Sequence, residues 1–88
     1  MSNGNPANKL DVILEERGKS NGDFKEMAET IQRLKQAMLC GHMKRNSVHN
    51  EAIDMICHKL GRIAAGDPNK EDHWRDIAGY ATLVADRV

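Results

Sequence analysis

Residues 47–88 read SVHNEAIDMICHKLGRIAAGDPNKEDHWRDIAGYATLVADRV, and this stretch decides the fold. Apolar residues recur every three or four positions on both sides of residues 66–69, which is the spacing of one helix face. Gly66 and Pro68 separate the two patterns, because glycine suits the left-handed residue after a helix and proline cannot continue one. The stretch therefore predicts a helical hairpin, with Asn46 or Ser47 capping the first helix and Asn69 capping the second.

The rest of the chain continues the helical pattern towards the N-terminus. Leu10, Ile13 and Leu14 predict a short helix over residues 9–17, and a longer helix is expected to start near Asp23 and end at Leu39 or Cys40. Residues 1–8 are rich in polar and turn-forming types and predict a disordered tail. We expect one all-α domain of four helices over residues 9–88, small enough at 88 residues for dimerisation to complete its core.

Composition excludes several classes of function. Thirteen Lys and Arg balance thirteen Asp and Glu, so the chain has no net positive field to attract a nucleic acid. The two cysteines are too few for a disulfide framework and favour a reducing cytoplasm, which is the host cytoplasm if the chain is phage-encoded. The longest apolar runs fall well short of the roughly 20 residues of a transmembrane helix, so no membrane span is expected.

A polar stripe accompanies the hairpin. Asp54 and His58 lie four residues apart on the polar side of the first helix, and Asp72 and Asp76 have the same spacing on the second. A short loop places the C-terminal half of the first helix beside the N-terminal half of the second. We therefore expect His58 to approach Asp72 or Asp76.

Carboxylates gathered in this way suit Mg²⁺ or Mn²⁺, which accept one or two carboxylates and then bind substrate phosphates. The predicted metal ligands are Asp54, Asp72 and Asp76. His58 is a candidate ligand or base, while Lys59 and Arg62 are candidate holders of phosphate charge.

Simpler explanations exist for the same residues. Acidic pairs at this spacing are also typical of solvated helices or of salt bridges between subunits, and Asp72 suits the positive end of a helix dipole. For His58 the simpler explanation is a hydrogen bond to a neighbouring carboxylate without any role in chemistry. Cys57 is expected to border the core as a small apolar residue, and Trp74 is expected to belong to the core.

Two blocks of the chain resemble a small phage and prophage family of unknown function. The first runs from Asp54 through His58 and Lys59 to Arg62-Ile63, and the second runs from Asp72 to Asp76-Ile77-Ala78-Gly79-Tyr80. The second block is similar, more distantly, to the all-α nucleoside triphosphate pyrophosphatases of the MazG and dimeric dUTPase kind. Those enzymes hold Mg²⁺ on helix-borne acidic residues and release pyrophosphate from nucleotides, usually as dimers or larger assemblies.

The resemblance implies that Asp54 and Asp76 occupy the two metal-binding helices. Its departures are also specific: Ala52-Ile53-Asp54 replaces part of the usual Glu-Glu-x-x-Glu, and His73 replaces the glutamate of Glu-x-x-Asp. The leading hypothesis is a phage-type, MazG-like homodimer or higher oligomer that binds a nucleotide phosphate through Mg²⁺, with His58 and Asp76 in the catalytic role. The competing hypothesis is a non-enzymatic phage protein that binds a host protein.

Overall fold

The computed structural model describes residues 10–16 and 22–88, and all the regular secondary structure in these residues is helical. The elements are a helix over residues 10–16, α2 (Phe24–Ala37), the 3-10 helix η1 (His42–Lys44), α3 (Ser47–Ala65) and α4 (Glu71–Ala85). The predicted all-α fold and its C-terminal hairpin are confirmed. The predicted tail and both ends of the first predicted helix, Lys9 and Arg17, lie outside the described residues. In the described part of the chain, no helix is both long and apolar enough to span a bilayer.

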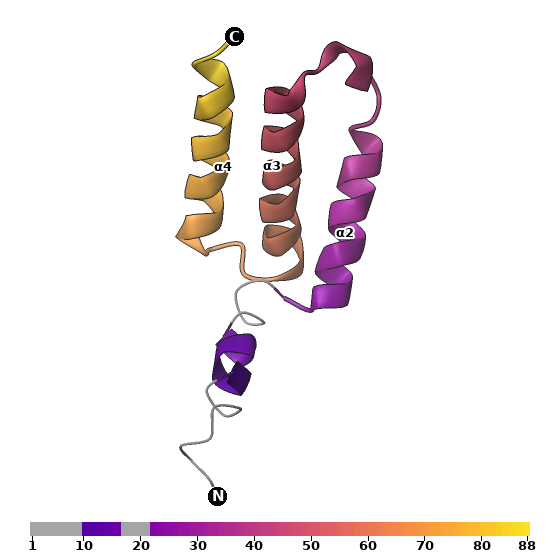
Figure 1. Cartoon of the computed structure of the whole chain (residues 1–88). Helices are drawn as coiled ribbons and strands as arrows, with labels where there is room; N and C mark the ends of the chain where they lie inside the picture. Colours follow the sequence, from indigo (N-terminus) through magenta and orange to yellow (C-terminus); the bar gives the residue numbers. More distant parts are fainter. Residues whose placement is uncertain (1–9, 17–21) are drawn as a thin grey trace, which may run out of the picture.

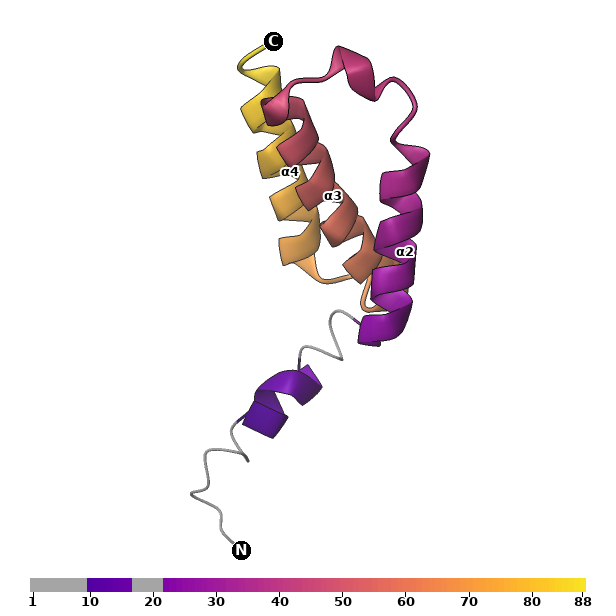
Figure 2. The same ribbon diagram turned by 45° about the vertical axis from the view of Figure 1, so that its right-hand side comes forward.

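The three longer helices lie side by side with α3 in the middle (Figure 1). The same order is kept when the molecule is turned by 45° (Figure 2). Within the described residues α3 packs against both neighbours, whereas α2 and α4 make no contact with each other. The helices therefore form a single layer in which each outer helix packs only on α3.

Burial is confined to the two seams beside α3. Among residues 10–16 and 22–88, the buried apolar side chains are Ile31, Ala52 and Cys57. The prediction for Cys57 is confirmed, but the prediction that Trp74 belongs to the core is wrong, because this side chain is 50% exposed. Its indole N–H donates to the carbonyl of Pro68 at 2.8 Å. On α4 the buried side chain is instead His73.

Side chains cap the first turns of α2 and α3. The carboxylate of Asp23 accepts a hydrogen bond from the backbone N–H of Glu26 at 3.0 Å and starts α2. The side chain of Asn46 accepts from the N–H of His49 at 3.0 Å, and the N–H of Asn46 donates to Nδ1 of His49 at 3.1 Å. Reciprocal bonds of this kind form a capping box, so Asn46 rather than Ser47 caps α3.

The chain enters α2 close to the end of α3. Gly22 has a φ of 81°, a value that L side chains rarely adopt. A Cβ at this position would overlap the backbone carbonyl of Ala65, the last residue of α3. Gly22 therefore lets the chain pass the end of α3 at close range.

The end of α2 comes earlier than predicted, at Ala37 rather than at Leu39 or Cys40. The guanidinium group of Arg45 donates to the backbone carbonyls of Met38 and Cys40. Met38 is the residue that caps the end of α2, and Cys40 lies in the turn that follows. Arg45 thus pairs carbonyls of the segment that leads out of the helix.

The turn of the hairpin differs from the prediction in its details. Gly66 follows α3 as expected, but its φ of −121° is outside the left-handed region. The prediction that Asn69 caps α4 is wrong, because the residue in the cap position is Lys70, and its side chain makes no capping bond. The side chain of Asp67 organises this turn by accepting from the N–H of Asn69 at 2.8 Å.

The seam between α2 and α3 depends on a glycine. Gly61 is buried against Ile31, and a Cβ at Gly61 would overlap Cγ1 of Ile31 and lie 2.9 Å from its Cδ1. The carbonyl of Met27 would lie 3.3 Å away. The absence of a side chain at Gly61 thus allows the two helices to approach closely.

We expect Gly61→Ala to lower the free energy of unfolding by about 1–3 kcal/mol, the usual cost of overpacking a well-packed contact. The control is Gly79→Ala on α4, where a Cβ would meet nothing within 4 Å. That change should raise stability by up to about 1 kcal/mol, because alanine favours helix. Denaturant unfolding followed by circular dichroism measures both values, and equal effects of the two substitutions would contradict the close packing at Gly61.

Candidate functional site

The candidate site lies on one side of the helix layer, where polar side chains of α2, α3 and α4 meet. We define this polar face by Lys35, His58, Lys59, Arg62 and Asp76. Two interactions join the helices across it. Lys35 of α2 contacts His58 of α3, and Lys59 of α3 contacts Asp76 of α4.

The ion pair between α3 and α4 has a short separation. Nζ of Lys59 lies 2.8 Å from Oδ2 of Asp76, and the Lys59 side chain is only 12% exposed. The methylene groups of Lys59 are therefore covered while its ammonium group reaches the carboxylate. The hydrogen bond from Lys59 lowers the pKa of Asp76 below its ordinary value. Asp76 is thus held as a carboxylate by one of the predicted phosphate-holding residues.

His58 lies in a positively charged environment. Nζ of Lys35 lies 3.3 Å from Nε2 of His58, and an ammonium group can only donate, so Nε2 must accept. Partial burial lowers the pKa of His58, and the positive charges of Lys35 and Arg62 lower it further. The imidazole is therefore neutral at neutral pH, with its proton on Nδ1.

Arg62 has an unused donor on this face. Its Nε is buried and has no hydrogen-bond partner among the described residues. Buried donors are rarely left unpaired in proteins, because an unpaired buried donor costs about 1–3 kcal/mol. Arg62 lowers the pKa values of both His58 and Asp76, which places its charge near both groups. An anion bound between them would give this donor a partner.

The predicted metal ligands are distributed over different places. Asp54 lies two helical turns before Gly61 and therefore on the side of α3 that meets α2, whereas Asp76 meets α3 from α4. Asp72 is exposed in the first turn of α4. Residues 10–16 and 22–88 contain no group of three or more His, Cys, Asp or Glu side chains that could hold a metal ion. The described residues therefore do not fit a preformed metal site, and the metal-binding role of these three aspartates stays a prediction.

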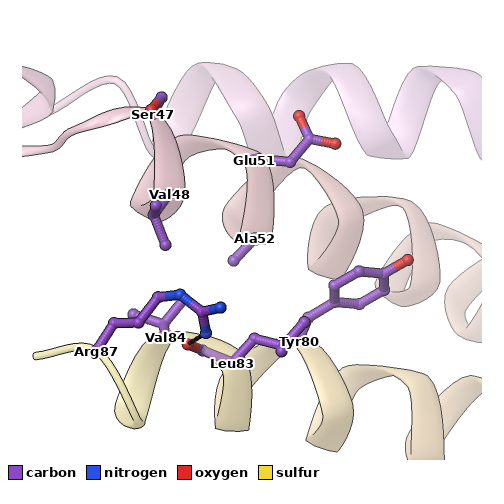
Figure 3. A pocket seen from close by; sticks show the side chains of 8 residues that line it. All are labelled: Ser47, Val48, Glu51, Ala52, Tyr80, Leu83, Val84 and Arg87. Atoms are coloured by element: carbon purple, nitrogen blue, oxygen red, sulfur yellow. Dashed lines mark hydrogen bonds between the residues drawn. The ribbon is translucent and has the colours of Figure 1, made fainter.

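An open groove of about 440 Å³ continues the polar face between the start of α3 and the end of α4 (Figure 3). Val48 and Ala52 point across it from α3 towards α4, and the ring of Tyr80 extends along it. The lining is mostly apolar and consists of Ser47, Val48, Glu51, Ala52, Tyr80, Leu83, Val84 and Arg87.

A shallower hollow connects this groove with the ion pair. It shares Tyr80 and Leu83 with the groove and is also lined by Asp76 and Gly79. Apolar surface suitable for a flat ring thus adjoins the cationic part of the polar face. The sequence did not indicate the wall formed by Val48 and Leu83, because these residues share a surface only when the hairpin is closed.

Lys35 was also absent from the sequence prediction. It lies 23 residues before His58, on another helix, and no local pattern connects the two. The predicted approach of His58 to Asp72 or Asp76 is replaced by this contact with Lys35, while Lys59 contacts Asp76. The position of α2 beside α3 therefore decides the surroundings of His58.

Comparison with known families identifies the chain. The family model described as Domain of unknown function (DUF6378) matches residues 7–88, which is nearly the whole sequence. The chain belongs to the DUF6378 family. Comparisons of this DUF6378 protein with curated proteins and with solved structures return no match.

The lowered pKa of His58 predicts a pH dependence of stability in this DUF6378 protein. The unfolded ring titrates near its ordinary value of about 6.5, so the unfolded chain binds this proton more tightly than the folded chain does. The stability contributed by the neutral ring is therefore fully present above about pH 6.5. It is lost as the pH falls from about 6.5 through the lower pKa that His58 has in the folded protein.

We expect the free energy of unfolding to fall between about pH 7.5 and about pH 5, and His58→Gln to reduce that slope. Denaturant titrations across this range measure it. His42→Gln on η1, where the histidine is exposed, is the control and should keep the slope. An unchanged slope in His58→Gln would show that His58 is not the titrating group.

Proposed function

We propose that this protein binds a nucleoside triphosphate on the polar face, with the phosphates held by Lys35, Lys59 and Arg62. The observation that carries the proposal is the buried, unpaired Nε of Arg62 beside other positive side chains. Guanidinium groups bind phosphate oxygens through charge-assisted hydrogen bonds. A phosphate would therefore supply the missing acceptor in a region where positive charge exceeds negative charge.

The groove beside Tyr80 provides a place for the base. Its apolar walls and the aromatic ring suit stacking with a flat heterocycle, and the Glu51 carboxylate at its edge can accept hydrogen bonds. Ala52 in the groove and Lys59 in the ion pair are seven residues apart on α3, or about 10 Å along the helix axis. This separation is similar to the distance between the base and the phosphates of a nucleotide.

The distant resemblance of residues 72–80 to MazG-like pyrophosphatases supports the same ligand class and adds a reaction. In that reaction water attacks a phosphorus atom, the bond between the α and β phosphates breaks, and pyrophosphate leaves. The neutral imidazole of His58 can accept the proton from the water at Nε2 once Lys35 leaves this nitrogen to bind phosphate, because burial, reinforced by the positive neighbours, keeps the ring unprotonated. Mg²⁺ would arrive with the phosphates, since it commonly binds proteins through one or two carboxylates plus substrate phosphates. Asp76 is the carboxylate that pairs with Lys59 of the proposed phosphate site.

Arg62→Ala should weaken nucleotide binding by about tenfold or more, because a hydrogen bond to a charged group contributes about 1.5–3 kcal/mol. The control is Arg33→Ala, which removes an exposed arginine from α2 outside the polar face. Isothermal titration of each purified variant with a panel of dNTPs in the presence of Mg²⁺ measures the affinities. Equal affinities of the two variants would contradict the assignment of Arg62.

Asp76→Asn separates metal binding from phosphate binding. Without Mg²⁺, the substitution should leave nucleotide affinity unchanged or higher, because Lys59 loses its ion pair and becomes available to phosphate. With Mg²⁺ it should lower the affinity, because asparagine is a weaker ligand than a carboxylate. Asp86→Asn, at the far end of α4, is the control.

Release of pyrophosphate from the same dNTP panel tests the reaction. If the wild-type protein neither binds nor hydrolyses any nucleotide with Mg²⁺, the proposal fails. The competing function, binding of a host protein without catalysis, then becomes the better explanation. It would be supported by a defined host partner whose binding persists in the Asp54→Asn and Asp76→Asn variants.

A further inference from the structure

An apolar stripe runs along α4 and continues to the C-terminus, with the members Trp74, Ile77, Ala81, Val84 and Val88. The centre of this stripe does not coincide with the side of α4 that packs on α3. His73 is buried, and Tyr80 and Val84 are partly buried, so these residues mark the packed side. Trp74 and Ala81 belong to the stripe but are exposed. At about 100° per residue, the stripe is rotated by roughly 60° from the packed side. Part of the apolar surface of α4 is therefore left without a neighbour among residues 10–16 and 22–88.

On α3, charged and apolar residues divide between the two surfaces of the layer. Ile53 and Arg62 are nine residues apart and therefore lie on opposite sides of the helix. Leu60 follows Ile53 by two turns and shares its side, and Ala64 lies one turn further along. Ile53 and Leu60 are only partly buried, and Ala64 is exposed. All four Asp, Glu, Lys and Arg residues of α3 fall on the other half of the helix.

The neighbouring helices follow the same division. On α4, Asp76 meets Lys59 on the polar face, and Trp74 and Ala81 lie on the opposite side of that helix. On α2, Lys35 meets His58, and Leu34 falls on the other side of Ile31. We call the resulting surface the apolar face, and its residues are Leu34, Ile53, Leu60, Ala64, Trp74 and Ala81.

We infer that the apolar face is covered by the same face of a second copy of the chain, which forms a two-fold symmetric dimer. Stable domains have at least two packed layers, and the described helices α2, α3 and α4 form only one. The face carries no charge, so pairing it with itself about a two-fold axis brings no like charges together. A second copy is also a partner that is always present when the chain is made.

The available area is sufficient for such a contact. The 15 residues of α4 are about 22 Å long, and three helix axes spaced at 8–10 Å give a width of about 20 Å. The footprint is thus about 450 Å² per copy, and the accessible surface over its side chains is larger. Two copies would bury on the order of 1,000 Å², which is the range where specific interfaces begin. The polar face lies on the opposite surface and stays open in this dimer.

Analytical ultracentrifugation of the full chain over the micromolar range tests the inference. The wild-type protein should sediment at twice the chain mass of 9.8 kDa. Ala81→Glu should raise the dimer dissociation constant by at least about tenfold, because it buries an unpaired charge in the interface. Ala81 is exposed in the single chain, so the substitution removes no contact within it.

Leu83→Glu is the matched control, because Leu83 is 51% exposed on the same helix but on the opposite surface. It should remain dimeric. If Ala81→Glu loses its helical circular dichroism, Ala64→Glu on α3 provides the decisive variant. A monomeric wild-type protein overturns the inference, and this includes a monomer whose apolar face is covered by residues 10–16. A dimer that is dissociated by Leu83→Glu, but not by Ala81→Glu or Ala64→Glu, overturns it as well.

Discussion

The close approach of α2 to α3 at Gly61 is the contact on which the other features of the structure depend. With no side chain at Gly61, Ile31 packs directly on the α3 backbone and fixes α2 along one side of that helix. α4 then occupies nearly the opposite side, where Lys59 reaches Asp76. Because the two outer helices are kept apart, both broad surfaces of α3 remain open. One of these surfaces is charged and the other is apolar.

The polar face shows why a neutral chain can still attract an anion. Thirteen positive and thirteen negative residues cancel over the whole sequence, yet Lys35, Lys59 and Arg62 meet on one surface with Asp76 as the carboxylate paired with them. The Lys59–Asp76 pair adds little to stability, because its carboxylate is well exposed to water. The ion pair instead affects the candidate site, because it keeps Asp76 ionised and partly neutralises the charge of Lys59. The separation of charge into two faces also means that the proposed nucleotide site and the proposed dimer contact lie on different surfaces.

Features set by nearby residues could be predicted from the sequence, while features set by packing could not. The caps at Asp23 and Asn46 come from side chains that bond within three residues, and the sequence predicted a helix start near Asp23 and a cap at Asn46 or Ser47. The sequence placed the end of α2 at Leu39 or Cys40 and could not show that Arg45 pairs the carbonyls of Met38 and Cys40 outside the helix. Trp74 was assigned to the core because an apolar stripe indicates which side of a helix avoids water, but not which neighbour covers it.

In the candidate site, too, the sequence predicts what lies on one helix but not what neighbouring helices bring together. Spacing correctly grouped His58 with Arg62 on one helix, but it could not show that Asp54 lies beside α2 and Asp76 beside Lys59. A carboxylate pair that looks convergent along the sequence can therefore belong to two different seams. Knowing the position of the middle helix is necessary before any metal ligand set can be assigned.

Cys57 has a further consequence as an intrinsic reporter of helix separation. Its thiol is buried in the layer, and burial, with the nearby charge of Asp54, raises its pKa. A protonated, covered thiol reacts slowly with alkylating reagents, whereas Cys40 is exposed to them. The rate of labelling at Cys57, compared with that at Cys40 in the same molecule, therefore measures how often the layer opens around α3.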